Sequence, residues 1–591
     1  LLDDNGQKQF DYGASRPSGQ QTNFNSIATL YDDKYALTSY SLSARTHLDF
    51  MGIEDHWSQG LKFQLNFGAD YYNSQSMVYY NPYFGNAESV NGRIQKTNTT
   101  SLGYTFNQLL SYNRTFGLHN IEYYAYPDSS LSGHKTGLPG AGIYELDAAA
   151  IIVGTGSSTD EDRIESFLSR VGYSYNDKYY LSGSWRTDGS SRFAPDTRWG
   201  NFWSVGASWR ISQEQFMQNI SWLDNLTLKF SYGVQGNNSV GSYYAYQALY
   251  DTSYTNATIS GVVINDVANE DLTWESNHNL NAGIEARLLN RIDLSFEFYN
   301  RKTTDMLLSY PLPVSSGFSG YYRNAGSMRN RGIEFAVTGR IIDRQDMQWS
   351  VTWMGSTVNN KVLKLTEDGQ DITGSTQIIR EGETLYSYYV SRSAGVDPMT
   401  GEKMYWATDE AGNDYITKDT DVAQNNRVIA GSRIPDLYGS ISTAFRWKNL
   451  DFSISTNYSI GGVNYDGVYY EFMSCYYTAQ AKHKDLLRAW KKPGDITDVP
   501  KYTIGETPIV TDDKLVDASY FSIKNITLGY TLPKSWTSKI GFKAARISAS
   551  VDNLCIFTHL KGMDPQYSLS GGTSYDYAPT RTVSFNLDLK F

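Results

Sequence analysis

The stretch that decides the fold is Arg581–Phe591, which reads RTVSFNLDLKF. Apolar side chains occupy every second position from Val583 to Phe591, and a polar side chain lies between each pair. Successive side chains of a β-strand point to opposite faces, so this pattern predicts a strand with one apolar and one polar face. One such strand also occurs in soluble sheets. The fold therefore depends on whether the pattern recurs along the chain.

The same alternation recurs along nearly the whole chain. In Leu61–Tyr71, Leu, Phe and Ala alternate with Lys, Gln, Asn and Gly, and residues 292–298 alternate in the same way. Counting such segments predicts about seventeen antiparallel strands. The apolar phase flips between Ile523 and Ile526, which predicts a β-bulge. The one segment with a clear helical pattern is Ala479–Lys491.

The connections between these strands fall into two classes. Short turns alternate with long polar loops, and such sorting is typical of an outer-membrane β-barrel with short periplasmic turns and long extracellular loops. A soluble sheet has no physical reason to sort its loops by side. The short connections are 176–178, 289–290, 448–449 and 533–544, and the long ones are 72–99, 236–272, 305–329, 362–435, 461–516 and 553–579.

Composition narrows the function classes. The chain has no run of about 18 apolar residues, so no transmembrane helix is expected. Its 47 Tyr and 13 Trp suit a membrane–water interface, where one end of the ring is apolar and the other wet. A formal net charge of −11 argues against nucleic-acid binding. The seven His lack metal-ligand spacing and no catalytic motif occurs, so we expect no metal, no cofactor and no enzymatic activity. Cys475 and Cys555 either pair or remain free thiols.

Whether the number of strands is odd or even leads to a further expectation. If the short turns are periplasmic, the first strand descends from outside and the last ends in the periplasm. Bacterial barrels have an even number of strands with both chain ends in the periplasm. An odd number of preceding strands is therefore expected outside these 591 residues.

Several blocks of sequence, in order, resemble the SusC/RagA family of TonB-dependent outer-membrane transporters of Bacteroidetes. The most distinctive block is RTDGSSRF, and the resemblance covers nearly the whole chain. The blocks are Arg186–Phe193, Asn269–Glu275, Phe298–Leu307, Asn324–Phe335, Asp517–Pro533, Ser550–Leu554 and Gly562–Gln566.

The resemblance implies a 22-stranded barrel in the outer membrane of a Gram-negative bacterium. Residues 1–591 would be its C-terminal part, while the N-terminal extension, the plug and the first strands would lie outside this chain. The family imports oligosaccharides or peptides. A SusD-like surface lipoprotein covers the barrel, TonB engages the N-terminal part, and a dimer of transporter–lid pairs is expected. The last strand, ending at Phe591, would act as the outer-membrane assembly signal.

The polar strand face is predicted to line the lumen, and it includes Lys62, Asn66, Asp293, Glu297, Asp451, Asp588 and Lys590. Tyrosine clusters in the loops are candidates for contact with a ligand or with the lid, since exposed aromatic residues are enriched where partners bind. The alternative is that they pack within ordered loops. The candidates are Tyr79, Tyr80, Tyr83, Tyr243, Tyr244, Tyr321, Tyr322, Tyr469, Tyr470, Tyr476 and Tyr477.

Three other functions compete with import. A passive porin or structural barrel would lack a plug, and a barrel-embedded hydrolase would need a catalytic cluster at the extracellular rim. A soluble all-β glycan-binding module would purify without detergent, whereas a barrel with a lipid-facing band would aggregate.

Overall fold

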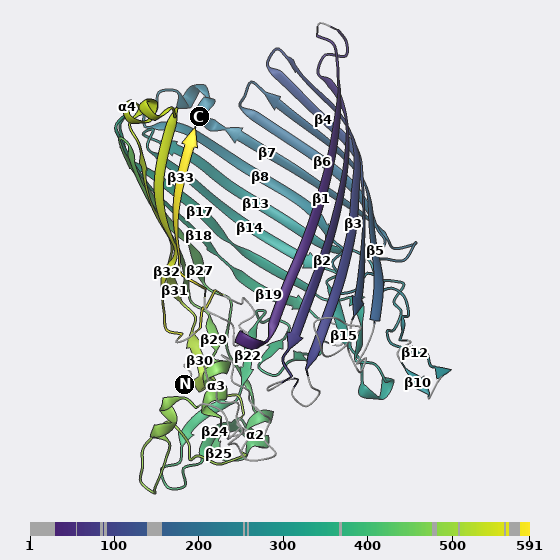
Figure 1. Cartoon of the computed structure of the whole chain (residues 1–591), viewed down its shortest axis with the longest axis vertical. Coiled ribbons are helices and arrows are strands. Elements are labelled where there is room, and N and C mark those ends of the chain that lie inside the picture. Colours follow the sequence, from purple (N-terminus) through teal and green to yellow (C-terminus); the bar gives the residue numbers. More distant parts are fainter. Residues whose placement is uncertain are drawn as a thin grey trace.

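A computed structural model describes residues 30–590, except 55, 83–86, 88–91, 139–155, 252–253, 257–258, 366–368, 475–481, 506–508, 561–562 and 567–578. Most of the described chain forms one curved antiparallel sheet (Figure 1). Each strand of this sheet pairs with the next in chain order, except that β19 pairs with β17 and β18 pairs with β27. Its strands are β1 (Lys34–Met51), β2 (Leu61–Tyr80), β3 (Arg93–Phe116), β4 (His119–Leu138), β5 (Gly156–Tyr175), β6 (Tyr179–Ser190), β7 (Trp199–Arg210), β8 (Leu223–Asn237), β13 (Glu275–Leu288), β14 (Ile292–Thr304), β17 (Ser327–Asp343), β18 (Met347–Thr357), β19 (Asn359–Lys364), β27 (Leu437–Trp447), β28 (Leu450–Ile460), β31 (Tyr520–Thr531), β32 (Ala544–Thr558) and β33 (Thr582–Lys590).

The count of spans agrees with the prediction from sequence. β18 and β19 both pair with β17 in one continuous register, since Ser356 lies opposite Glu334 and Asn359 opposite Arg331. They therefore form one span, and the eighteen strands of the sheet make seventeen spans. β1 and β33 are the two edges of the sheet, each paired with one neighbour within the described residues.

The short turns are confirmed and gather at one end of the sheet, the upper end in Figure 1. In the turn between β5 and β6, Asn176 and Asp177 both have a φ of +51°. Leu289 and Asn290 adopt the same left-handed conformation between β13 and β14, with φ of +55° and +54°. Two successive positive φ values give the hairpin turn that matches strand twist. The Leu289 N–H donates to the carbonyl of Trp222 at 2.8 Å, which helps to hold this otherwise unfavourable leucine conformation.

The long connections lie at the opposite end and carry small elements of their own (Figure 1). The strands there are β9 (Tyr250–Asp251), β10 (Thr255–Asn256), β11 (Ile259–Ser260), β12 (Val263–Ile264), β15 (Leu307–Pro311), β16 (Gly320–Asn324), β20 (Ile372–Thr373), β21 (Gln377–Ile379), β22 (Ser387–Val390), β23 (Arg392–Val396), β24 (Lys403–Thr408), β25 (Asp414–Thr417), β26 (Val428–Ser432), β29 (Val463–Tyr465) and β30 (Leu515–Asp517). The helices whose bounds lie within the described residues are α2 (Thr420–Asn425), α3 (Gly467–Met473) and α4 (Lys534–Thr537). The 3₁₀ turns there are Ile211–Gln213, Gln215–Met217, Val314–Ser316, Lys484–Arg488, Asp512–Lys514 and Ser538–Ile540. No helix in the described parts of the chain is long and apolar enough to cross a membrane.

The first long connection is shorter than the expected loop 72–99. β2 continues to Tyr80 and β3 begins at Arg93, so only residues 81–92 connect them. Polar side chains bridge the extended ends of both strands, as when the Asn73 amide donates to the Asn98 side chain at 2.9 Å. β2 to β5 have 20 to 24 residues each, about twice the 9–11 that cross a bilayer. These strands therefore continue beyond the membrane.

The predicted bulge is confirmed, whereas the predicted helix is wrong. Ile523 and Asn525 pair with consecutive residues of β28, so Lys524 is the extra residue. Residues 479–481 of the expected helix lie outside the described residues, and the rest form only the 3₁₀ turn Lys484–Arg488. Trp490 explains the difference, because its N–H donates to the Val499 carbonyl at 3.1 Å and its indole N–H to the Pro398 carbonyl at 2.9 Å. These tertiary contacts hold the backbone extended from Ala489 onward.

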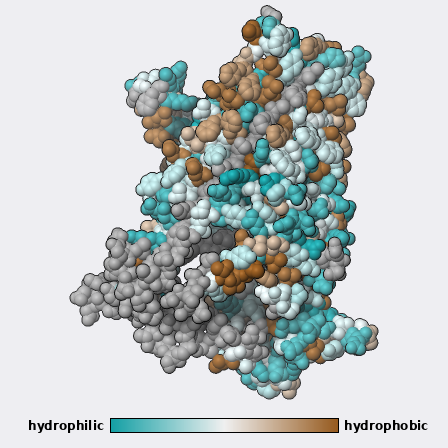
Figure 2. Space-filling view, turned by 90° about the vertical axis from the view of Figure 1, so that its right-hand side faces the viewer, coloured by the Kyte–Doolittle hydropathy of each residue, from teal (hydrophilic) through white to brown (hydrophobic). Residues whose placement is uncertain are grey.

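The two faces of the sheet differ as the alternation predicted. The apolar face is exposed, and on β33 Val583, Phe585 and Leu587 are 57%, 80% and 62% exposed. Figure 2 shows apolar side chains mostly towards the short-turn end and hydrophilic ones prevailing towards the long-loop end. Exposed apolar surface on this scale marks a face in contact with lipid.

On this apolar face, two glycines accommodate a tyrosine ring. Tyr458 of β28 lies over Gly355 of β18 and Gly439 of β27, where an added Cβ would meet its hydroxyl at 2.9 and 2.8 Å. The hydroxyl accepts a hydrogen bond from the Trp353 indole at 2.9 Å and donates to the Met354 carbonyl at 3.0 Å. Trp353 is 45% exposed on this face, as expected for an aromatic girdle at the lipid–water interface, whereas Tyr458 is buried.

Candidate functional site

The polar face of the sheet carries cross-strand ion pairs. Arg546 donates to Asp451 at 2.6 Å and Arg287 to Asp293 at 2.7 Å, while Lys62 lies 2.9 Å from Asp49. The polar residues predicted to share this face do so. Exposed pairs of this kind contribute only about 0–1 kcal/mol each. Their main effect is to fix which charges line the inner wall.

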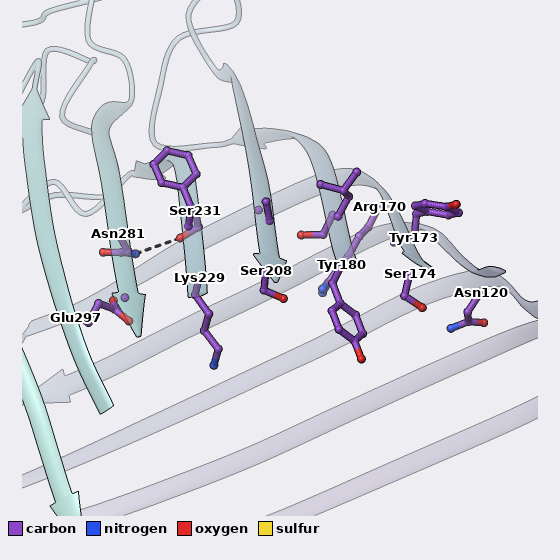
Figure 3. Close-up of a pocket in the computed structure, with 17 residues that line it drawn as sticks. Asn120, Arg170, Tyr173, Ser174, Tyr180, Ser208, Lys229, Ser231, Asn281 and Glu297 are labelled. Carbon is purple, nitrogen blue, oxygen red and sulfur yellow. Dashed lines mark hydrogen bonds between the residues drawn. The ribbon is translucent and has the colours of Figure 1, made fainter. Parts of the chain in front are cut away.

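A hollow of about 510 Å³ lies on this polar face where β5 to β14 meet (Figure 3). Its floor follows the strand register: Gly172 lies opposite Ser182, Ser182 opposite Gly206, and Gly206 opposite Ser231. Small side chains in one row across four strands leave the space empty. Arg170, Tyr180, Lys229, Asn281 and Glu297 surround it. The result is a depression with a floor of small residues and hydrogen-bonding groups at its margin.

At the long-loop end of the sheet, residues from the sequence blocks that resemble the SusC/RagA family form a small apolar core, which we call the rim core. Phe193 and Leu272 are fully buried there, and Phe202 and Trp274 are nearly so. The Phe193 and Trp274 ring centroids are 5.6 Å apart, and the Trp274 indole N–H donates to the Arg198 carbonyl at 2.7 Å. This core joins the turn after β6 to the loop before β13 and holds the rim of the barrel in one shape.

A second ordered unit is built from the two longest loops. β22, β26 and α2 enclose Tyr388, Val390 and Ala423, each at most 1% exposed. Beside this core, the loops enclose a cavity of about 100 Å³. Its apolar lining includes Tyr405, Tyr470 and Val499. The remaining lining residues are Lys403, Tyr469, Met473, Ser474, Leu486, Asp498, Pro500, Lys501, Ile509, Thr511 and Lys514.

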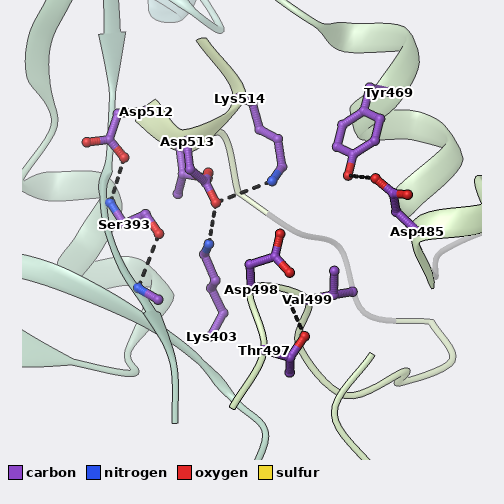
Figure 4. Close-up of polar contacts among 12 residues, drawn as sticks. Ser393, Lys403, Tyr469, Asp485, Thr497, Asp498, Val499, Asp512, Asp513 and Lys514 are labelled. Atoms are coloured by element: carbon purple, nitrogen blue, oxygen red, sulfur yellow. Dashed lines mark hydrogen bonds and ion pairs between the residues drawn. The ribbon is translucent and has the colours of Figure 1, made fainter. Parts of the chain in front are cut away.

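A carboxylate beside this cavity is held between two lysines (Figure 4). Asp513 lies 2.5 Å from the Lys403 Nζ and 3.3 Å from the Lys514 Nζ. Burial alone would raise the pKa of Asp513, but the two ammonium groups together lower that pKa to about 2. Burial, together with the hydrogen bond to Asp485, raises the pKa of Tyr469 to about 12, and burial raises that of Tyr470 to about 12. Both phenols are therefore neutral hydrogen-bonding groups at physiological pH.

The predicted tyrosines fall into several settings. Tyr79 and Tyr80 belong to β2, while Tyr83, Tyr476 and Tyr477 lie outside the described residues. Other members are held within the loops, since the Arg192 guanidinium lies 4.7 Å from the Tyr243 ring centre, Tyr244 accepts from the Glu161 N–H, Tyr321 packs on Tyr310, and Tyr322 packs on the rim core. Tyr469 and Tyr470 line the loop cavity.

The cavity also brings together residues that no pattern in the sequence associates. Lys403 and Lys514 are 111 positions apart, and neither belongs to a motif. Only the packing of two loops against each other makes them neighbours, so no local signal could have found them. Within the described residues, no group of three His, Cys, Asp or Glu side chains could hold a metal ion.

Comparison with known proteins gives consistent relationships. A family described as TonB dependent receptor-like, beta-barrel, matches residues 2–554. TonB-dependent receptor P3 of Formosa agariphila is 29% identical over 98% of this chain and 62% of its own length. TonB-dependent receptor SusC of Bacteroides thetaiotaomicron is 27% identical over 92% of this chain and 56% of its own length. The structure of the RagAB peptide transporter is similar with a TM-score of 0.87 and 26% identity, over 98% of this chain and 64% of that one.

The chain spans about three fifths of the length of these relatives, 62% for P3 and 64% for the RagAB chain. The relatives are receptors and transporters. The exposed apolar face, the sorted loops and the family match together place this barrel in the outer membrane. The chain therefore belongs to the family of TonB-dependent receptor β-barrels.

Proposed function

We propose that this chain is the barrel part of a TonB-dependent importer that takes up oligosaccharides or peptides together with a SusD-like surface lipoprotein. The observation that carries the proposal is the similarity to the RagAB peptide transporter, which extends over 98% of the chain with a TM-score of 0.87. The relationship to SusC supports the same class. A dimer of transporter–lid pairs is the assembly that we propose.

The polar inner wall supports this function physically. Its cross-strand ion pairs and the hollow of about 510 Å³ suit a hydrated lumen and a docked polar domain better than they suit hydrocarbon. We propose that residues 1–591 are the C-terminal part of the importer. In this proposal further strands join β1 to β33, and a plug and a TonB-contacting segment lie outside these 591 residues.

The tyrosine candidates can be ordered by their surroundings. We propose Tyr469 and Tyr470 first, because they line the cavity among the loops. Tyr243 and Tyr321 rank lower, because neither lines this cavity and their rings contact Arg192 and Tyr310 instead. Tyr470→Ala should weaken uptake or lid binding several-fold. Tyr310→Ala, which removes a loop ring outside the cavity, is the matched control.

The function is tested by deleting the full-length gene in its own host and measuring growth on defined oligosaccharides and on peptides. Complementation should restore growth on one class, and collapse of the proton-motive force should stop the uptake. A lipoprotein should co-purify with the detergent-extracted protein. Uptake that persists without proton-motive force would instead support a porin, and release of cleaved substrate into the medium would support a hydrolase.

A further inference from the structure

Four cationic side chains lie together on the sheet at its long-loop end. Lys302 of β14 is opposite Arg329 of β17, and Arg329 is opposite Lys361 of β19. Arg331 lies two residues along β17 on the same face. Neighbouring strands are about 4.8 Å apart, so the four groups share a small area. We call Lys302, Arg329, Arg331 and Lys361 the outer basic cluster.

The strand register places this cluster on the apolar face. Phe298 and Lys302 are four positions apart on β14, and their pairing with β17 has no irregularity between them. On β17, Ile333 and Arg331 are two positions apart in the same unbroken register. Even spacing along a strand keeps side chains on one face. Phe298 and Ile333 are 41% and 37% exposed on the lipid-facing side, so the cluster also points outward, away from the lumen.

The cluster has no counter-charge within the described part of the chain. Its four side chains form none of the ion pairs found there, whereas Arg287, Arg340 and Arg546 on the inner face each pair with an aspartate. The Arg329 Nε is buried and has no hydrogen-bond acceptor. Like charges directly opposite one another on a sheet are destabilising. Such an arrangement is expected where an external anion supplies the missing charge.

The height of the cluster indicates which anion this is. Four residues along a strand correspond to about 13 Å, which places Lys302 just beyond the apolar band that contains Phe298. The headgroup zone lies directly outside a hydrocarbon core of about 30 Å. Basic side chains at this level attract anionic lipids, and the arginine fork matches a phosphate group. His278, opposite Lys302 on β13, adds a further hydrogen-bonding group beside the cluster.

We propose that the outer basic cluster binds the phosphate groups of an anionic lipid in the outer leaflet. The acyl chains of this lipid then lie along the apolar side chains below, including Phe298 and Ile333. One lipid, or a small number of them, is thereby held at a fixed place on the barrel wall between β14 and β19.

The test uses the full-length protein in a mild non-ionic detergent. It is titrated with diacyl phosphatidic acid or with phosphatidylcholine of the same chains, and bound lipids are counted by native mass spectrometry. We expect phosphatidic acid to bind at least tenfold more tightly than phosphatidylcholine. The combined Lys302→Gln, Arg329→Gln, Arg331→Gln and Lys361→Gln variant should lose this preference. Arg301→Gln is the matched control. Arg301 immediately precedes Lys302 on β14, but its side chain faces inward and donates to the Asn279 side chain at 2.7 Å.

The outcomes separate the alternatives. Unchanged phosphatidic acid binding in the combined variant would overturn the proposal, as would an equal loss in Arg301→Gln. Displacement of the lipid by an equal concentration of inorganic phosphate would show that the cluster binds free phosphate, and it would refute the assignment of a lipid as the ligand. Heat-modifiable gel migration checks folding. If the combined variant does not fold, the single variant Arg331→Gln is used instead. Its preference for phosphatidic acid and that of the unaltered protein are measured at low and at high salt. A preference that does not change with salt would contradict the proposal.

Discussion

The rim core predicts a measurable local opening when one ring is removed. Phe193 is fully buried against Trp274, Phe202 and Leu272. This core packs the turn after β6 against the loop before β13, and hydrogen bonds from Thr197 to the Leu272 carbonyl and from Trp274 to the Arg198 carbonyl join the same two segments. We expect Phe193→Ala to leave the membrane-spanning strands intact, because Phe193 lies beyond the end of β6. The loops of the rim should open far more often.

The magnitude follows from the burial. Truncating a fully buried phenylalanine to alanine costs about 3–5 kcal/mol. That energy corresponds to a roughly 10²- to 4 × 10³-fold larger population of the open rim, at about 1.4 kcal/mol for each factor of ten. Amides whose hydrogen bonds close this rim should exchange faster by a similar factor. Two of them are Leu272, which donates to the Asn269 carbonyl at 3.3 Å, and Thr273, which donates to the Asn324 side chain at 2.8 Å.

Hydrogen–deuterium exchange of the full-length protein in detergent measures this effect directly. Peptides containing residues 269–274 should lose protection, while peptides from β27 and β28 should not change. Phe216→Ala is the control, because Phe216 is 66% exposed at the short-turn end. Unchanged exchange at Leu272 and Thr273 in Phe193→Ala would refute the view that this core holds the rim together.

Three further predictions follow from other features. Gly439→Val should destabilise the barrel by about 1–3 kcal/mol, as overpacking does, because a Cβ there meets the Met354 carbonyl at 2.0 Å and the Tyr458 hydroxyl at 2.8 Å. The midpoint of heat-modifiable gel migration should shift to a lower temperature. An unchanged midpoint would contradict the close packing at Gly439. The pKa of Asp513 is depressed in the folded state from 3.8 to about 2, so its contribution to stability is present above about pH 4 and is lost as the pH falls towards 2. Pepsin should therefore cut residues 403–514 faster as the pH falls over this range, and Asp513→Asn should show a smaller rise, whereas an identical rise would speak against the role of Asp513. Deleting Phe591 should lower the amount of folded barrel in outer membranes, and undiminished folded protein on gels would count against an assembly role.

Much of the barrel was predictable because its cause is local. Alternation along Arg581–Phe591 follows from a strand between lipid and water, and the left-handed turn at Asn176 and Asp177 uses residues that tolerate positive φ. The bulge at Lys524 appeared as a phase flip. In each case a few neighbouring residues contain the whole signal.

The loop structures were not predictable, because their causes lie far away in sequence. The segment before Trp490 has good helix formers, yet it forms only the 3₁₀ turn Lys484–Arg488, because Trp490 contacts Pro398 and Val499 and the backbone is extended from Ala489. Conversely, Gly467–Met473 is rich in aromatic residues but forms a helix, which the Asp466 side chain caps by accepting from the Tyr469 N–H at 2.9 Å. The loop cavity likewise required residues 403, 469 and 514 to meet.

The contrast between the barrel wall, which is the large sheet, and the loops means that two different environments stabilise this polypeptide, lipid for the wall and water for the loops. The wall exposes Phe585 and Leu587 and depends on hydrocarbon to cover them, whereas Tyr388 and Val390 in the loop unit are buried by protein alone. A change of detergent should therefore alter the melting of the wall and leave the loop unit nearly unaffected. Selection can accordingly remodel the loops under the rules of soluble proteins, while the strands beneath them keep their register.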